Sequence, residues 1–262
     1  RSRRLFADPI PTGMSLETDV IACAQIVEKG DPDRFRTVMA AKLSERPVLF
    51  PLYAFNIEIS RAPWVTQEPM IAEMRLQWWR DALEEIAQGD PVRQHEVTTP
   101  LSRFLTRDQA KLLDEAVALR RWDVYKEPFD DQAHFDDYVD ATAGHLMWTA
   151  ASQLGARDEA PVRALAFGAG VATFLRAIPT LESAGRVPLL DGTHDGIRML
   201  AARALARSAQ GRIGRNPALW PAIGARHVLQ QAIKEPAAVG EGRLAPPLTA
   251  FRLIWTKLTG RG

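Results

Sequence analysis

Apolar residues recur at helical spacing along almost the whole chain, and this pattern constrains the fold more than any other feature of the sequence. Residues 45–60, for example, place Leu49, Leu52, Phe55 and Ile59 on one face of a helix. No segment alternates apolar and polar residues between hairpin turns, as strands do. Proline and glycine fall mainly between the periodic segments. The sequence therefore predicts an all-α protein.

Start and stop signals mark where the predicted helices begin and end. Asp31-Pro32 supplies an N-cap and a proline at the first helical position, and Gly89-Asp90-Pro91 ends the helix before it. No linker of distinct composition divides the chain, so we expect a single domain over residues 1–262. Residues 1–14 are expected to form an extended arm, and 236–247, rich in Gly, Ala and Pro, a mobile loop. The predicted helices cover residues 15–29, 45–60, 69–88, 99–105, 107–124, 135–153, 160–181, 195–208, 217–234 and 247–258.

The charge and cysteine content exclude several classes of protein. The 33 Lys and Arg residues nearly balance the 32 Asp and Glu residues, so no excess of basic charge points to nucleic acid. The single cysteine, Cys23, rules out an internal disulfide and a metal site built from cysteines. No apolar run approaches the roughly 20 residues that cross a bilayer, and the basic start, Arg1–Arg4, lacks the apolar segment of a signal peptide. We therefore expect a cytoplasmic protein with at most peripheral membrane contact.

An acidic motif, DDYVD at residues 136–140, matches the DDxxD pattern of magnesium–diphosphate sites. Asp136 and Asp140 are one helical turn apart, so both carboxylates project from one face, where they suit Mg²⁺. Such a site normally needs a second acidic helix opposite, and cations for the diphosphate. We therefore prefer a solvated helix start, which the helix dipole favours. A second pattern, Gly168-Ala169-Gly170, fits close packing of helices better than a nucleotide-binding loop.

Three groups of residues, taken together, resemble one known family. The first is 52–61, LYAFNIEISR, and the second is 74–83, MRLQWWRDAL. The third combines 138–144 with 172–177 and 185–190. In this order and spacing they resemble the squalene/phytoene synthase family, closely over residues 31–190 and loosely over the last third. The resemblance implies an isoprenoid-synthase-type helical bundle.

The resemblance also indicates what this chain lacks. The positions of the family's two aspartate-rich motifs correspond to Ser60, Trp64, Thr173 and Ala177, none of which is acidic. The departure of a diphosphate needs metal ions to offset its negative charge. The resemblance therefore implies a protein without catalytic residues, bound metal or cofactor. It also places residues 136–140 in a segment that is not one of the family's metal motifs.

Within the family, residues 53–58 and 74–80 are most similar to a divergent branch, that of a mitochondrial assembly factor for respiratory complex I. This similarity implies a non-catalytic protein that binds complex I subunits, as an assembly factor or an accessory subunit, and no nucleic acid. It also implies a place beside the inner membrane, on the matrix side or in a bacterial cytoplasm. The contacts expected in a retained cavity or anion site are Tyr53, Glu58, Arg61, Trp78 and Arg176.

Two other hypotheses remain open from the sequence. The first is an active, magnesium-dependent head-to-head prenyltransferase with an altered site around Glu58, Asp136 and Asp140. The second is an isoprenoid- or lipid-binding protein that keeps the cavity without the chemistry. A cavity blocked by Trp64 and Trp78 would count against the second hypothesis. The aromatic and basic segment 251–258 could lie at a membrane interface or pack on the bundle.

Overall fold

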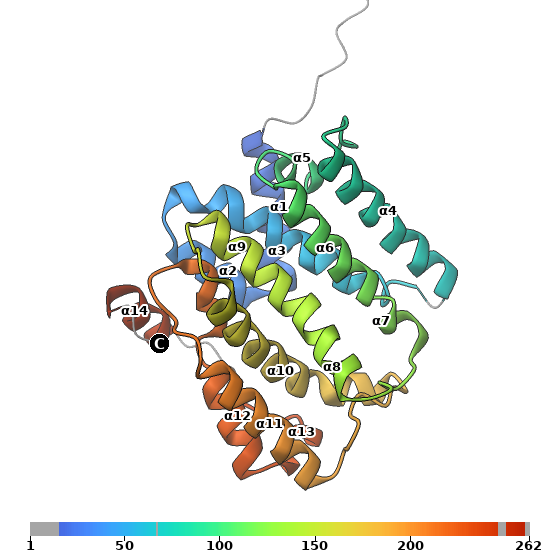
Figure 1. Cartoon of the computed structure of the whole chain (residues 1–262), viewed down its shortest axis with the longest axis vertical. Coiled ribbons are helices and arrows are strands. Elements are labelled where there is room, and N and C mark those ends of the chain that lie inside the picture. The colour runs from blue at the N-terminus through green and yellow to red at the C-terminus, as the bar shows by residue number, and fades with distance from the viewer. Residues whose placement is uncertain (1–15, 67, 246–249, 260–262) are drawn as a thin grey trace, which may run out of the picture.

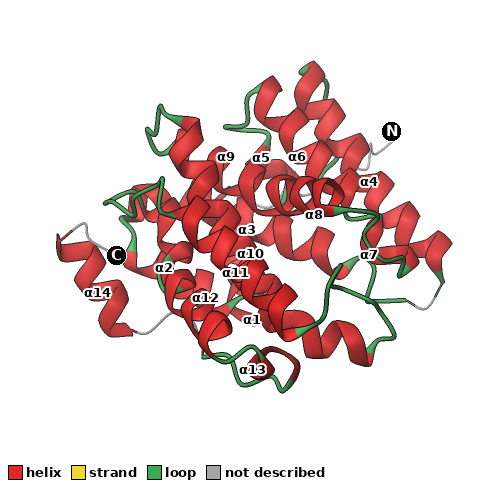
Figure 2. Cartoon of the chain, turned by 60° about the horizontal axis from the view of Figure 1, so that its bottom comes forward, coloured by secondary structure: helices red, strands yellow, loops and turns green. Residues whose placement is uncertain are grey.

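Helices make up the architecture, as the periodicity predicts. The computed structural model describes residues 16–66, 68–245 and 250–259, and no strand occurs in these ranges (Figure 2). The expected N-terminal arm, 1–14, lies outside them. Three shorter elements are the 3₁₀ helices η1 (Leu43–Glu45) and η3 (Pro217–Ala222) and the π-helical turn η2 (Asp140–His145). The α-helices are α1 (Leu16–Gly30), α2 (Pro32–Ala40), α3 (Arg46–Arg61), α4 (Pro69–Gln88), α5 (Thr98–Leu101), α6 (Arg107–Leu119), α7 (Trp122–Tyr125), α8 (Gln132–Val139), α9 (Leu146–Gln153), α10 (Glu159–Ser183), α11 (His194–Ser208), α12 (Ala225–Lys234), α13 (Ala237–Gly240) and α14 (Ala250–Thr259).

Local capping explains why several helices begin and end as expected. The Asp31 side chain accepts a 2.9 Å hydrogen bond from the Arg34 backbone N–H, and Pro32 occupies the first helical position of α2. Gly89 ends α4 in the left-handed conformation, with φ 76°, which glycine adopts at little cost. The predicted bounds 69–88 for α4 are confirmed.

The central helix, α10, joins two hydrophobic cores. Its first half, including Val162 and Ala166, packs into a core shared with α1, α3 and α9. Its second half, including Val171 and Leu175, packs into a core shared with α8, α11 and α12. Figure 1 shows α10 between the group of α4 and α6 and the group of α11 to α13. The two cores are therefore held together by one continuous helix.

By length and composition alone, α10 could span a membrane. It has 25 residues, so the expectation that no apolar run approaches bilayer length is corrected here. However, 61% of its most apolar window is buried inside the protein. A central helix surrounded by other helices is apolar on all sides for that reason.

The glycines of α10 allow neighbouring helices to approach closely. A Cβ on Gly168 would lie 2.5 Å from the Ser208 Cβ of α11. A Cβ on Gly170 would lie 2.8 Å from Val139 Cγ1 and 2.9 Å from the Ala143 Cβ. These contacts confirm that the glycine pair serves helix packing.

Several predicted helices are interrupted. Residues 107–124 form two helices because i→i−3 hydrogen bonds, such as Arg120 N–H to Val117 O, tighten the chain after α6. Residues 217–234 also form two elements, since Gly224 takes a positive φ of 88° between η3 and α12. The helix predicted over residues 135–153 begins at Gln132 and is interrupted by the π-helical turn η2.

The expected loop at 236–247 begins instead with a short helix, α13. Its Ala238 and Val239 are fully buried in the second core, and this apolar contact orders the segment. Residues 246 and 247 lie outside the described ranges.

Candidate functional site

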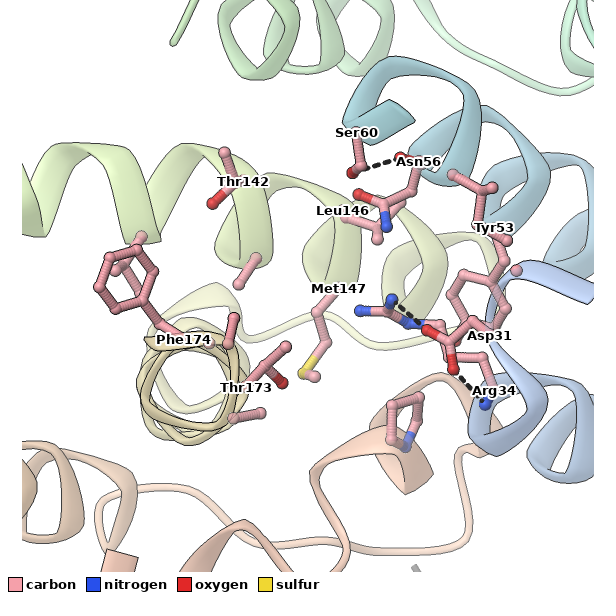
Figure 3. Close-up of a pocket in the computed structure, with 18 of the residues that line it drawn as sticks. Asp31, Arg34, Tyr53, Asn56, Ser60, Thr142, Leu146, Met147, Thr173 and Phe174 are labelled. Atoms are coloured by element: carbon pink, nitrogen blue, oxygen red, sulfur yellow. Dashed lines mark hydrogen bonds and ion pairs between the residues drawn. The ribbon is translucent and has the colours of Figure 1, made fainter. Parts of the chain in front are cut away.

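A cavity of about 420 Å³ lies between α2, α3, α10 and the rod formed by α8, η2 and α9. Figure 3 shows Tyr53, Asn56 and Ser60 of α3 on one side and Thr173 and Phe174 of α10 on another. These two helices carry the two segments in which the family resemblance places aspartate-rich motifs. A volume of this size is in the range of ligand pockets, about 300–1,000 Å³.

The cavity brings together most of the residues singled out from the sequence, although they are more than a hundred positions apart. Ser60 lies in the last turn of α3, and its hydroxyl donates a 2.6 Å hydrogen bond to the Asn56 carbonyl. Trp64, which follows α3, is 44% exposed. The sequence-predicted residues that line the cavity are Tyr53, Ser60, Arg61, Trp64, Thr173, Arg176 and Ala177.

Glu58 and Trp78 do not contact this cavity, contrary to expectation. They line a separate pocket of about 180 Å³ with Trp79 and His95. Glu58 precedes Ser60 by two residues on α3, a rotation of about 200° around the helix axis. The two side chains therefore lie on opposite faces, which helical geometry alone could have indicated.

The magnesium ions of the family do not fit the donors found here. Ser60, Thr173, Trp64 and Ala177 offer two hydroxyls, an indole and a methyl group, whereas Mg²⁺ is held in proteins mainly by carboxylates. In the described part of the chain, no group of three or more His, Cys, Asp or Glu side chains is placed to hold a metal ion.

Three carboxylates do line the cavity, but each is already paired with an arginine. The pairs are Asp31–Arg34 at 2.8 Å, Asp33–Arg36, and Asp123–Arg120 at 3.1 Å. Because a guanidinium neutralises each carboxylate, none of them is available as a metal ligand without breaking an ion pair.

A buried polar network forms one wall of the cavity, and sequence reasoning missed it. The Arg120 guanidinium donates to the Tyr138 hydroxyl at 2.8 Å, and this hydroxyl donates to the Asp123 carboxylate at 3.1 Å. Arg186 donates to the Asp123 carbonyl and stacks over the Trp64 ring at 5.0 Å. Burial, with the Asp123 charge nearby, raises the pKa of Tyr138 above its ordinary value. Tyr138 therefore stays neutral and serves as a fixed hydrogen-bonding group.

A second polar group lies beside α2. The Asp31 carboxylate accepts from the Arg34 guanidinium, which lies 5.3 Å over the Tyr53 ring (Figure 3). Burial raises the pKa of Tyr53, and the Asp31 charge adds to the effect. Because Arg34 is both paired with Asp31 and stacked on Tyr53, its guanidinium is held in place on the side of the cavity opposite α10.

The aspartates of the DDxxD motif do not line the cavity, and two of them form ion pairs. Asp136 accepts two hydrogen bonds from Arg203 of α11, and Asp140 accepts one from Arg163 of α10 at 2.8 Å. Asp137 is exposed. The altered catalytic site that was hypothesised around Asp136, Asp140 and Glu58 is therefore not formed in this cavity.

Both the sequence and the fold are similar to those of known proteins. The squalene/phytoene synthase family profile matches residues 27–189, and the chain belongs to that family. A crystal structure of a dehydrosqualene synthase in complex with ligand superposes with a TM-score of 0.71 at 13% identity, covering 93% of this chain and 95% of that one. The squalene synthase HpnC from Alicyclobacillus acidocaldarius superposes with a TM-score of 0.68 at 17% identity, covering 87% of this chain and 97% of that one. The isoprenoid-synthase-type bundle expected from the sequence is confirmed.

Among curated proteins, similar sequences are named as assembly factors rather than as synthases. The NADH dehydrogenase (ubiquinone) complex I, assembly factor 6 homolog of Drosophila melanogaster is 30% identical over 166 residues, which are 60% of this chain and 50% of that protein. Complex I, assembly factor 6 of Bos taurus is 25% identical over 204 residues, 71% of this chain and 60% of that protein. The human protein is 24% identical over 165 residues, 60% and 48% respectively. The chain thus spans about half the length of the curated relatives it matches.

Proposed function

We propose that this chain is a non-catalytic member of the squalene/phytoene synthase family that serves respiratory complex I. The observation that carries the proposal is the donor set of the cavity, which is lined by Ser60, Trp64, Thr173 and Ala177. These are the positions at which the family resemblance places the metal-binding aspartates. The similarity to proteins named complex I assembly factor 6 supports the choice of partner. The chain would bind complex I subunits as an assembly factor or accessory subunit, peripheral to the membrane that holds the complex.

The physical reason for a loss of catalysis is electrostatic. Ionisation of an allylic diphosphate separates several negative charges from a carbocation, and metal ions supply most of the stabilisation of the leaving group. Arginines can contact the diphosphate, but they do not replace a cluster of divalent ions in a site open to water. We therefore expect pure protein to form no head-to-head product from prenyl diphosphates with Mg²⁺. A magnesium-dependent condensation product, detected by mass spectrometry, would refute the non-catalytic assignment.

The partner is tested separately. Deleting the gene in the organism that encodes the chain should lower the amount of assembled complex I on native gels, together with NADH:quinone oxidoreductase activity. Re-expression should restore both. Complex I purified from mildly solubilised membranes then distinguishes the two roles, since an accessory subunit is present at about one copy per complex and an assembly factor is enriched in assembly intermediates. A normal amount of assembled complex I with normal activity in the deletion strain would refute the proposed role in serving complex I.

A second candidate function is binding of an isoprenoid or another lipid. The open cavity favours it, because Trp78 lines a different pocket and Trp64 does not close the space between α3 and α10. Native mass spectrometry of the protein as purified should then detect a co-purifying apolar molecule. A molecule that is released on unfolding and then identified would show that the chain is a carrier. If no such molecule is found, the chain does not carry a lipid.

A further inference from the structure

Two arginines of the cavity have no partner among the described residues. Arg61 and Arg176 line the cavity, and their guanidinium groups form no ion pair or hydrogen bond within that part of the chain. The other arginines that line it, Arg34 and Arg120, are paired with Asp31 and Asp123. The unneutralised charge of the cavity is therefore positive.

The two arginines stand directly beside the positions at which the family resemblance expects metal-binding aspartates. Arg61 follows Ser60 at the end of α3, and Arg176 precedes Ala177 on α10. A site for Mg²⁺ needs negative charge at these places, whereas this chain supplies positive charge. The charge of this site is thus opposite in sign to that of a metal-binding site. A positively charged site can bind an anion directly, without a metal ion between them.

Part of the remaining lining of the cavity is apolar. Leu146 and Met147 extend from the start of α9, and Phe174 extends from α10 (Figure 3). Ile57 and Leu181 also line the cavity. Apolar surface combined with a small number of placed polar groups is typical of sites that orient a ligand.

We infer that the cavity binds an amphiphile with a single anionic head, a phosphate monoester or a carboxylate, without a metal ion. Arg61 and Arg176 hold the head, and the tail packs between α9 and α10. The inference rests on the non-catalytic part of the proposed function and is independent of complex I. Binding by the pure protein tests it, so failure here leaves the complex I experiments unaffected.

The test is isothermal titration of the purified chain with dodecyl phosphate in buffer containing EDTA. We expect saturable binding whose affinity is unchanged when Mg²⁺ replaces EDTA. Arg61→Gln and Arg176→Gln should each weaken binding by about tenfold or more, the usual effect of losing a charged hydrogen bond. Arg226→Gln is the matched control, because Arg226 is an exposed arginine of α12 that does not line the cavity. It should bind as the wild type does.

Two further ligands separate the head from the tail. Dodecanol has the tail without the charge and should bind at least tenfold more weakly than dodecyl phosphate. Displacement of bound dodecyl phosphate by a short-chain phosphatidic acid would support the inference with a membrane lipid as the ligand. Displacement by inorganic phosphate at the same concentration would overturn it, since the tail would then contribute nothing.

Three other results would overturn the inference. They are equal affinity for dodecanol, binding that requires Mg²⁺, and unchanged affinity in both cavity variants. Circular dichroism melts of each variant show whether it is folded. Arg61→Lys and Arg176→Lys keep the charge and should retain part of the affinity, so a folding defect and a loss of charge can be told apart.

Discussion

At the scale of single residues, the cavity depends on polar groups that are buried in pairs and triplets. Asp123 is 4% exposed and Arg186 is 6% exposed, yet each finds partners from another part of the chain. An unpaired buried charge would be far more costly than an unpaired surface charge. The network therefore fixes the wall of the cavity, and its members cannot be removed one at a time without loss of stability.

Tyr138→Phe tests this network. The substitution keeps the ring but removes the hydroxyl that joins Arg120 to Asp123. We expect the free energy of unfolding to fall by about 1–3 kcal/mol, because the two charged groups lose a shared partner. Tyr125→Phe is the control, since Tyr125 is 53% exposed and should change stability by less than about 0.5 kcal/mol. Urea denaturation measures both, and equal effects would contradict the role of the network.

His145 predicts a pH dependence of stability. It is buried, its Nδ1 lies 2.7 Å from the Leu112 carbonyl, and burial lowers its pKa, with Arg163 adding to the shift. The unfolded chain therefore binds a proton more readily than the folded one. Its contribution to stability is full above the ordinary pKa of 6.5 and is lost as the pH falls below that value.

His145→Asn removes this titration and keeps an amide that can reach the same carbonyl. We expect the loss of unfolding free energy between about pH 8 and about pH 5 to be smaller in the variant than in the wild type. His227→Asn, at an exposed position of α12, should behave as the wild type does. Parallel pH profiles for wild type and His145→Asn would contradict the assignment.

At the scale of elements, close approach of helices overrides helix propensity. Gly168→Ala would raise intrinsic helix propensity by about 1 kcal/mol, but the new Cβ would meet Ser208 at 2.5 Å and the Ala204 carbonyl at 3.4 Å. We expect a net loss of about 1–3 kcal/mol from overpacking. Gly240→Ala, in α13, meets nothing within 4 Å and should be neutral or slightly stabilising. Thermal melts would compare the two, and a stabilised Gly168→Ala would show that α11 can move away.

The elements also show what the sequence could and could not predict. The bounds of α4 follow from a proline at its start and a glycine after its end, and both signals are local. The cavity positions Ser60, Thr173 and Ala177 were found because the family's segments have a recognisable order. The Tyr138 network was missed because hydrogen-bonded partners in it, such as Arg186 and Asp123, are up to 63 residues apart and share no motif. Burial of polar groups is decided by tertiary contacts, which periodicity does not report.

At the scale of the whole molecule, α10 makes two cores behave as one. Both hydrophobic cores include its side chains, so neither can separate from the other without unfolding this helix. We expect a single cooperative transition, with circular dichroism and tryptophan fluorescence coinciding. Trp220 reports on the first core and Trp122 on the second. Two transitions, resolved by replacing either tryptophan with phenylalanine, would show that the cores unfold separately.

A π-helical turn holds one residue more than an α-helical turn, so η2 acts as a one-residue insertion in the rod from Gln132 to Gln153. Before it, Val139 packs into the second core, and after it, Met147 packs into the first. If the same residues formed an unbroken α-helix instead, every later side chain would be turned by about 100°. The π-helical turn therefore sets which side chains of α9 face the first core, and deleting one residue within the turn should leave those side chains buried.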